Sequence, residues 1–212
     1  MKILLFGVSC VGKSTVGEIL AKKLGYKYFD LDDEVKKYFN TTIDNFVNTG
    51  WLYDRDMKRG EVLRNIIHHN DDLVLAVTPV YYITGIKRYI QSPDFLRIEL
   101  YDSPENIFER IIYTDENDEV YDNEEYKQSH RKELIREIKK DITCYGAKYK
   151  SIGMSGRFNV NGESAETVAD RLITEYNLKG GLQVKIVLIL NYFKFPIDNY
   201  MKTDYNKHIQ MR

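Results

Sequence analysis

The sequence lacks the features that mark secreted, disulfide-bonded or membrane-spanning proteins. Its 212 residues include only two cysteines, Cys10 and Cys144, which are too few for a disulfide framework and too far apart for a C-x-x-C metal pair. The longest apolar run, residues 184 to 190, has the length of a strand and falls short of the about 18 residues that span a bilayer. We therefore expect a cytoplasmic protein with no membrane partner.

An excess of charge of one sign is also missing. Lysine and arginine number 31 against 32 aspartates and glutamates, which leaves a formal net charge of −1. This balance gives no overall attraction to nucleic acid, so no nucleic-acid partner is expected. Histidine is scarce, and no cluster has metal-ligand spacing, so His68, His69 and His130 are expected to face solvent.

The sequence does contain a complete phosphate-binding motif near its start. Residues 7 to 15 are Gly-Val-Ser-Cys-Val-Gly-Lys-Ser-Thr, which satisfies G-x-x-x-x-G-K-[ST]. In this motif backbone N–H groups converge on phosphate oxygens, the lysine reaches the β- and γ-phosphates, and the serine hydroxyl ligates Mg²⁺. The motif predicts ATP and Mg²⁺ as ligands. The nucleotide-binding candidates in the loop are Ser9, Cys10, Val11, Gly12, Lys13, Ser14 and Thr15.

The sequence around the motif predicts an α/β fold. An apolar strand pattern over residues 1 to 6 precedes the loop, and a helical pattern over 16 to 24 follows it. Strands and helices continue to alternate, which predicts a three-layer α/β/α P-loop NTPase fold with a five-stranded parallel sheet. The other expected strands are 26 to 30, 72 to 77, 95 to 100 and a short one near 158 to 160. The other expected helices are 33 to 48, 55 to 69, 83 to 91, one starting at 103, 126 to 149 and 163 to 177.

Two segments depart from this alternation. Residues 114 to 127 are acidic and weakly periodic, so we predict a mobile, solvated lid over about residues 112 to 130 instead of regular core structure. The domain that contains the phosphate-binding motif is predicted to end at residue 179. Residues 180 to 212 form a C-terminal extension that we expect to supply an edge strand plus a tail, or a dimer contact; monomer and homodimer both stay open.

From Met1 to about Leu178 the order of motifs resembles the shikimate kinase branch of the small P-loop kinases. The likeness is strongest over the first 34 residues, which include Phe29-Asp30-Leu31-Asp32. The resemblance implies that Asp30 helps to hold Mg²⁺ through water, and that Asp32 binds a substrate hydroxyl and assists its deprotonation. Carboxylates at the carboxyl end of a parallel strand suit both roles. Asp33 and Glu34 are expected only to stabilise the helix N-terminus.

The resemblance also supplies two arginine candidates. Gly50 and Arg55 keep the ends of the family's G-E-x-x-F-R element, whose arginine holds the substrate carboxylate. Arg110 falls where the family places an arginine against the adenine. Each has a structural alternative, since Arg55 could form a solvated ion pair on a charged helix and Arg110 could lie on a helix surface.

Two departures concern the acceptor pocket. Thr78-Pro79-Val80 replaces three family glycines, so side chains fill space that backbone would otherwise leave open. Asp141 stands where the family's second carboxylate-binding arginine is expected. The lid arginine has no clear counterpart, and Arg131 is the nearest candidate. The replaced glycines and Asp141 argue against shikimate as the acceptor, and the identity of the acceptor stays open.

The sequence therefore predicts an ATP-dependent kinase that transfers the γ-phosphoryl group to a hydroxyl of a small metabolite, with Lys13 and Asp32 as catalytic residues. One alternative is a nucleoside or nucleoside monophosphate kinase, in which Tyr53, Tyr81 and Tyr82 would stack on a base. The other is a non-catalytic ATP-binding regulatory module.

Overall fold

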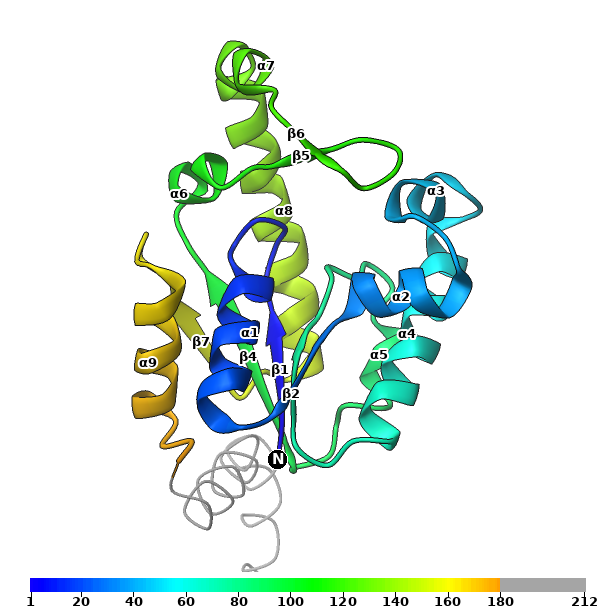
Figure 1. Cartoon of the computed structure of the whole chain (residues 1–212), viewed down its shortest axis with the longest axis vertical. Helices are drawn as coiled ribbons and strands as arrows, with labels where there is room; N and C mark the ends of the chain where they lie inside the picture. The colour runs from blue at the N-terminus through cyan, green and yellow to red at the C-terminus, as the bar shows by residue number, and fades with distance from the viewer. Residues whose placement is uncertain (180–212) are drawn as a thin grey trace, which may run out of the picture.

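A computed structural model of the chain describes residues 1 to 179 (Figure 1). The predicted extension over residues 180 to 212 lies outside the described residues. The strands are β1 Lys2–Phe6, β2 Lys27–Asp30, β3 Leu73–Ala76, β4 Phe95–Tyr101, β5 Tyr113–Thr114, β6 Val120–Tyr121 and β7 Gly156–Asn159. The helices are α1 Lys13–Leu24, α2 Leu31–Phe39, α3 Ile43–Asn48, α4 Leu52–His68, α5 Thr84–Lys87, α6 Pro104–Glu109, α7 Glu124–Ser129, α8 Arg131–Ile152 and α9 Ala165–Glu175. No helix in residues 1 to 179 combines the length and apolar character needed to cross a membrane.

Five strands form one parallel sheet in the order β2-β3-β1-β4-β7. Strand β1 lies at its centre, and its side chains alternate between two apolar layers. Ile3 and Leu5 belong to the cluster that includes α1 and α9, whereas Leu4 and Phe6 belong to the cluster that includes α4 and the end of α8. The predicted three-layer α/β/α fold with a five-stranded parallel sheet is confirmed.

The predicted helix over residues 33 to 48 is wrong in one respect, because the chain breaks it into α2 and α3. Asn40 adopts a left-handed conformation with φ 49° and ends α2. The Thr42 hydroxyl then accepts a hydrogen bond from the Asn45 backbone N–H at 3.1 Å and starts α3. These two cap residues end one helix and begin the next, within a pattern whose periodicity alone predicts a single helix. The predicted helix at 83 to 91 is also shorter, since only α5 forms there.

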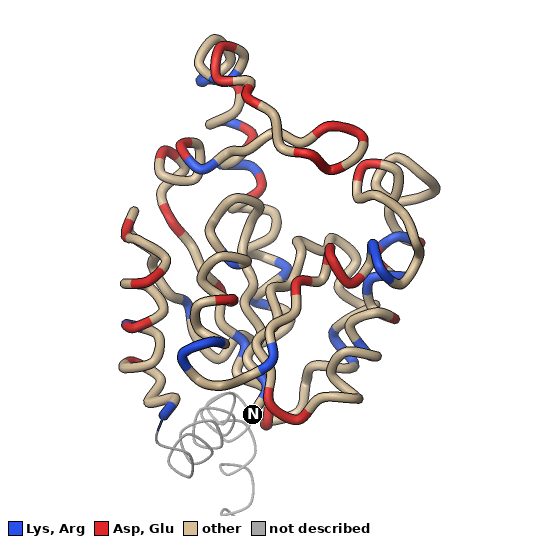
Figure 2. The backbone as a smooth tube through the Cα atoms, in the orientation of Figure 1, with Lys and Arg blue, Asp and Glu red and all other residues tan. Residues whose placement is uncertain are grey.

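Residues 114 to 127, predicted to be solvated and not part of the core, contain regular elements that their weak periodicity did not indicate. Strands β5 and β6 pair as an antiparallel hairpin, and α7 follows directly. The Asp115 carboxylate accepts hydrogen bonds from the backbone N–H groups of Asn117 and Glu119, each at 2.9 Å, which fixes the turn. The predicted exposure is confirmed, and Figure 2 shows acidic residues gathered along this hairpin. We call residues 113 to 121 the lid hairpin.

Helices α4 and α5 pack closely against each other. Gly60 is buried on α4, and a Cβ atom built there would overlap the backbone of Gly85 on α5. A Cβ atom at Gly85 would likewise meet the backbone oxygen of Asp56 at 2.9 Å. Neither glycine can gain a side chain unless two helices separate.

We predict that Gly60→Ala lowers the free energy of unfolding by about 1 to 3 kcal/mol, because overpacking forces the backbones apart. Urea unfolding followed by circular dichroism measures this change. Gly146→Ala is the matched control, since it also adds a methyl group inside a helix, but that methyl group would lie 4.0 Å from the side-chain oxygen of Glu99. The control should stabilise the protein by roughly 0.8 kcal/mol through helix propensity. Equal effects of the two substitutions would contradict the packing argument.

Candidate active site

The phosphate-binding loop connects β1 to α1 and has the backbone conformation that its glycines allow. Gly7 has φ 143°, and a Cβ atom there would lie 2.5 Å from the backbone oxygen of Leu100. Gly12 has φ 105° and Cys10 has φ 59°, so the loop turns sharply twice before the helix begins. Within the described residues, no hydrogen bond uses the backbone N–H groups of residues 9 to 15. The loop and the N-terminus of α1 therefore present unused donors to an anion.

Lys13 is buried at the start of α1, with only 8% of its surface exposed. Its ammonium donates a hydrogen bond to the backbone oxygen of Val8 at 2.8 Å. Burial lowers the pKa of Lys13 to about 8, and the carboxylates of Asp30 and Asp32 oppose that shift. A buried cation with few partners gains strongly from a phosphate placed in the loop.

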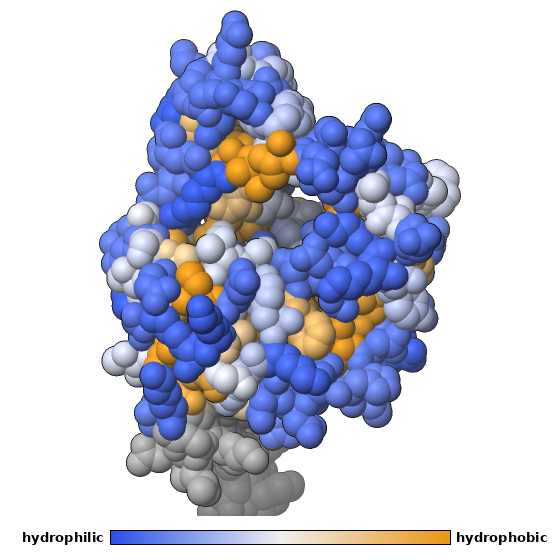
Figure 3. Space-filling model, in the orientation of Figure 1, coloured by the Kyte–Doolittle hydropathy of each residue, from blue (hydrophilic) through white to orange (hydrophobic). Residues whose placement is uncertain are grey.

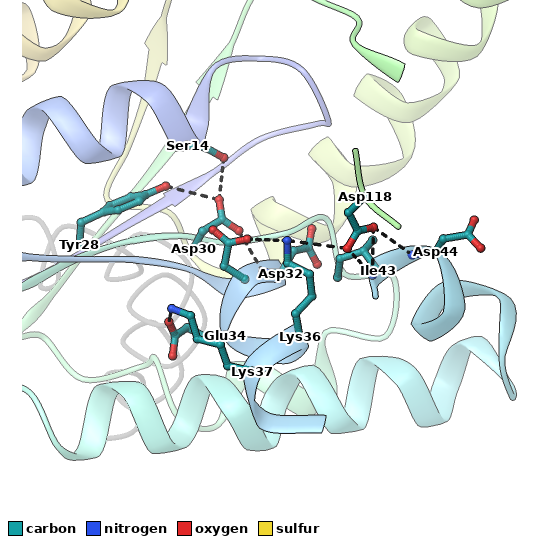
Figure 4. Close-up of polar contacts among 11 residues, drawn as sticks. Ser14, Tyr28, Asp30, Asp32, Glu34, Lys36, Lys37, Ile43, Asp44 and Asp118 are labelled. Carbon is teal, nitrogen blue, oxygen red and sulfur yellow. Dashed lines mark hydrogen bonds and ion pairs between the residues drawn. The ribbon is translucent and has the colours of Figure 1, made fainter. Parts of the chain in front are cut away.

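Ser14 and Asp30 come from different elements and meet beside the loop (Figure 4). The Ser14 hydroxyl donates to Asp30 Oδ2 at 2.6 Å, and the Tyr28 hydroxyl lies 3.4 Å from the same oxygen. Asp30 Oδ1 accepts from the backbone N–H of Asp32 at 2.9 Å and caps α2. A hydroxyl and a carboxylate in contact are the oxygen donors that Mg²⁺ prefers, so these residues fit the predicted metal role.

Asp32 is the second residue of α2 and lies in its first turn. Its Oδ1 atom is buried without a hydrogen-bond partner. Burial raises the pKa of Asp32, while a hydrogen bond with Thr78 and the charge of Arg59 act in the opposite direction. The Arg59 guanidinium lies 3.7 Å from Oδ1, too far for a hydrogen bond. Asp32 thus has a free acceptor atom, as a residue that binds a substrate hydroxyl requires.

The structure adds a buried pair that sequence reasoning missed. Asp56 is fully buried, and its Oδ1 lies 3.3 Å from Nη1 of Arg59, which is also buried. Asp56 Oδ2 accepts the backbone N–H groups of Tyr81 at 3.0 Å and Tyr82 at 2.9 Å. The pair therefore anchors the segment after Pro79. The charged residues of α4 alone predicted a solvated face. The i, i+3 spacing of Asp56 and Arg59 was the sequence signal that could have indicated an ion pair.

Arg55 stands one turn before Arg59, so the i, i+4 spacing places both on the same side of α4. Its side chain is partly buried, and its Nε atom is buried without a hydrogen-bond partner. No ion pair of Arg55 occurs within residues 1 to 179. The solvated ion pair considered as an alternative is therefore not formed there. That Arg55 binds a substrate carboxylate stays a prediction, and a guanidinium without an ion pair is consistent with this role.

The remaining charged candidates lie in structural contacts. Arg110 Nη2 bonds to the buried carboxylate of Asp102 at 2.6 Å, which ties α6 to the end of β4. Arg131 bonds to Glu109 at 2.9 Å and lies over the Phe108 ring at 4.3 Å. Contact of Arg110 with adenine and of Arg131 with a phosphate remain predictions. Residues 1 to 179 contain no group of three or more His, Cys, Asp or Glu side chains that could hold a metal ion.

Three tyrosines form a cluster between the start of α4 and the segment that precedes α5. Tyr53 and Tyr82 have ring centroids 5.3 Å apart, and Tyr81 and Tyr82 are 5.1 Å apart, all in edge contacts. All three rings are more than one third exposed. The ammonium of Lys148 lies 4.0 Å from the centre of the Tyr81 ring and links this cluster to α8.

Sheet order, loop conformation and the Lys13, Ser14 and Asp30 cluster together define a P-loop nucleotide-binding protein. Comparison with known proteins narrows this class. The shikimate kinase family model matches residues 9 to 174. The chain therefore belongs to the shikimate kinase family.

Individual relatives agree with this assignment. A shikimate kinase from Clostridium botulinum is 39% identical over 75 residues, which make up 35% of this chain and 44% of that enzyme. The Bacteroides thetaiotaomicron shikimate kinase structure has a TM-score of 0.68 at 18% identity and covers 84% of this chain and 98% of its own. The Acinetobacter baumannii shikimate kinase in complex with shikimate has a TM-score of 0.61 at 22% identity, with coverages of 85% and 94%. The chain spans less than half the length of the curated relatives that it matches by sequence.

We predict that the affinity for MgATP depends on pH through Lys13. The lysine pKa of about 8 means that the ammonium form prevails below that pH and is lost above it. Bound phosphate favours the ammonium, so affinity should be highest below pH 8 and fall above it, by at most about tenfold per pH unit. Calorimetric titration in buffers of different ionisation enthalpy should also detect proton uptake on binding near that pKa.

Lys13→Arg is the control for this titration, because guanidinium stays charged throughout the range. Its affinity, whatever the absolute value, should be flat where the wild type declines. A decline of equal size in both proteins would show that another group controls the pH dependence.

Proposed function

We propose that the protein is an ATP-dependent kinase that transfers the γ-phosphoryl group to a hydroxyl of a small-molecule acceptor. The observation that carries the proposal is the position of Asp32. Its Oδ1 accepts no hydrogen bond, its backbone N–H donates to the Asp30 carboxylate that contacts Ser14, and its charge acts on Lys13. An acceptor hydroxyl held there would face the terminal phosphate of a nucleotide in the loop.

Each group of residues has a separate role that follows from its charge. Backbone N–H groups of residues 9 to 15 bind the phosphates, and the Lys13 ammonium neutralises charge on the β- and γ-groups. Ser14 and Asp30 would hold Mg²⁺, which when bound neutralises phosphate charge and aligns the transferred group. Asp32 orients the acceptor hydroxyl and takes its proton as the new oxygen–phosphorus bond forms and the bond to the β-phosphate oxygen breaks.

Anion binding by Arg55 would select the acceptor. Its guanidinium is uncommitted, whereas that of Arg59 already faces Asp56 and Asp32. A carboxylate or phosphate on the acceptor would complete the hydrogen bonds that Arg55 lacks. Shikimate carries such a carboxylate, but Thr78-Pro79-Val80 and Asp141 alter the surroundings in which the family binds it.

A nucleoside or nucleoside monophosphate acceptor is the second candidate. The cluster of Tyr53, Tyr81 and Tyr82 favours it, because partly exposed aromatic rings beside the site offer faces and edges to a flat base. A panel of shikimate, gluconate, nucleosides and nucleoside monophosphates, assayed for ATP-dependent product formation by mass spectrometry, separates the two candidates. Phosphorylation of none of these compounds, with ATP binding intact, would favour a regulatory ATP-binding module over a kinase.

We predict that Asp32→Asn lowers kcat for the best acceptor by roughly 10²- to 10⁴-fold, which is the range for loss of a general base. Affinity for MgATP should change little. Asp33→Asn is the matched control, since Asp33 is the next residue on α2, is exposed and pairs with Lys36. Retention of wild-type kcat by Asp32→Asn would exclude Asp32 as the base, and an equal loss in Asp33→Asn would point to damage to the helix.

A further inference from the structure

The lid hairpin crosses from the α6 and α7 side of the molecule to α3 (Figure 1). It contributes little apolar contact on the way, since Ile112 next to it is 66% exposed and Val120 within it is 67% exposed. Figure 3 shows apolar surface along the lid and a hollow beneath it. Whatever holds the hairpin on the far side must therefore be a polar contact.

One side chain makes that contact. Asp118 Oδ2 accepts the backbone N–H of Ile43 at 2.9 Å, and Oδ1 lies 3.2 Å from the same nitrogen and 3.4 Å from that of Asp44 (Figure 4). Lys36 on α2 lies 3.8 Å from Oδ2. Only 17% of the Asp118 side chain is exposed, in a hairpin whose other acidic residues are solvated.

The contact completes the start of α3. The first N–H groups of a helix have no partner within the helix. The Thr42 hydroxyl accepts the N–H of Asn45. The Asp118 carboxylate accepts the N–H groups of Ile43 and Asp44, although these residues lie 75 and 74 positions away in the sequence. Hydrogen bonds to a carboxylate are about twice as strong as neutral ones, and its charge also suits a helix N-terminus.

The hairpin tip is built to present this carboxylate. The Asp115 side chain fixes the turn from within, and the Asp118 N–H donates to the backbone oxygen of Asp115 at 3.0 Å. Asp118 itself has φ 64°, a left-handed conformation that aspartate tolerates better than most residues. Position 118 therefore needs a residue that tolerates a left-handed backbone conformation and carries a negatively charged acceptor.

The docked elements belong to the acceptor side of the site. Helix α2 carries Asp32 and also carries Lys36, which pairs with Asp118. Helix α3 carries Phe46, whose ring lies 5.2 Å from the Arg59 guanidinium. A contact that fixes the start of α3 is thus linked through α2 to Asp32, and through Phe46 to Arg59, which lies beside Asp32.

We propose that Asp118 is a positioning residue, a latch that docks the lid hairpin on the N-terminus of α3 and so closes the acceptor side of the site. This inference rests on the proposed kinase function for its catalytic consequence, but the latch itself is a contact that can be tested without turnover. Opening the latch frees the hairpin and admits water beside the acceptor, while the phosphate loop keeps its own contacts.

The direct test is hydrogen exchange at the amides of Ile43 and Asp44, measured by NMR on the full chain. Asp118→Ala should speed exchange of both amides by about tenfold or more, because they lose their acceptor. Asp118→Asn keeps an acceptor oxygen and loses the charge, so its exchange rates should lie between those of the wild type and those of Asp118→Ala. Glu116→Gln is the matched control, since it removes a charge from the same exposed turn and should leave both rates unchanged. Unchanged exchange in Asp118→Ala would overturn the latch.

The kinetic test uses the same variants with the acceptor found by the panel. Asp118→Ala should raise KM for the acceptor by about tenfold, with affinity for MgATP within about twofold of wild type, and Asp118→Asn should recover part of the loss. Faster amide exchange in Asp118→Ala with an unchanged KM for the acceptor would exclude a role of Asp118 in closing the lid hairpin over the acceptor. If no acceptor is phosphorylated, the proposed function fails, while the exchange rates still decide whether Asp118 holds the lid hairpin.

Discussion

The short contact between the Ser14 hydroxyl and the Asp30 carboxylate is the interaction on which the rest of the site depends. It joins the phosphate loop to the end of β2, two segments that the sheet separates by the whole of β3. The same carboxylate caps α2 through the N–H of Asp32. One aspartate therefore fixes where a metal would sit relative to the loop and where the proposed base sits relative to the metal. Loss of this group would displace both.

Burial gives the two proposed catalytic side chains opposite shifts. Leaving water disfavours the charged form of each, which lowers the pKa of Lys13 and raises that of Asp32. Their charges partly compensate each other across the loop. A phosphate bound beside Lys13 would favour its ammonium form. The apolar layers on both sides of the sheet provide the stability that tolerates this arrangement.

The buried pair of Asp56 and Arg59 shows how the acceptor side departs from a glycine-lined pocket. Three glycines would bring backbone close to a ligand, whereas Thr78-Pro79-Val80 brings side chains. The chain then fixes the following segment by giving its N–H groups to Asp56. Arg59 is partly neutralised by this carboxylate, which leaves Arg55 as the arginine on that helix side without an ion pair in residues 1 to 179.

The sequence predicts the elements that carry strong local signals. Continuous apolar strands and the complete loop motif give the sheet, the layers and the positions of Lys13, Ser14, Asp30 and Asp32, because each follows from pattern and strand order. Asp118 illustrates what the sequence could not predict. Its partners, Ile43 and Asp44, are 75 and 74 positions away, and within an acidic turn it is distinguished only by a left-handed backbone and a tertiary contact. The burial of Asp56 and Arg59 was not predicted for the same reason. Charged residues on a helix predict a solvated face, and only the tertiary structure shows that another element covers them.

The most direct test of this account is the Mg²⁺ dependence of ATP binding to the wild type and to Asp30→Ala, measured by calorimetry on the full chain. If Asp30 couples the metal to the loop, Mg²⁺ should tighten ATP binding to the wild type and have a much smaller effect on the variant, while Asp33→Asn behaves as the wild type. Equal tightening by Mg²⁺ in wild type and Asp30→Ala would contradict the account, because the contact between Ser14 and Asp30 would then have no part in forming the metal–nucleotide site.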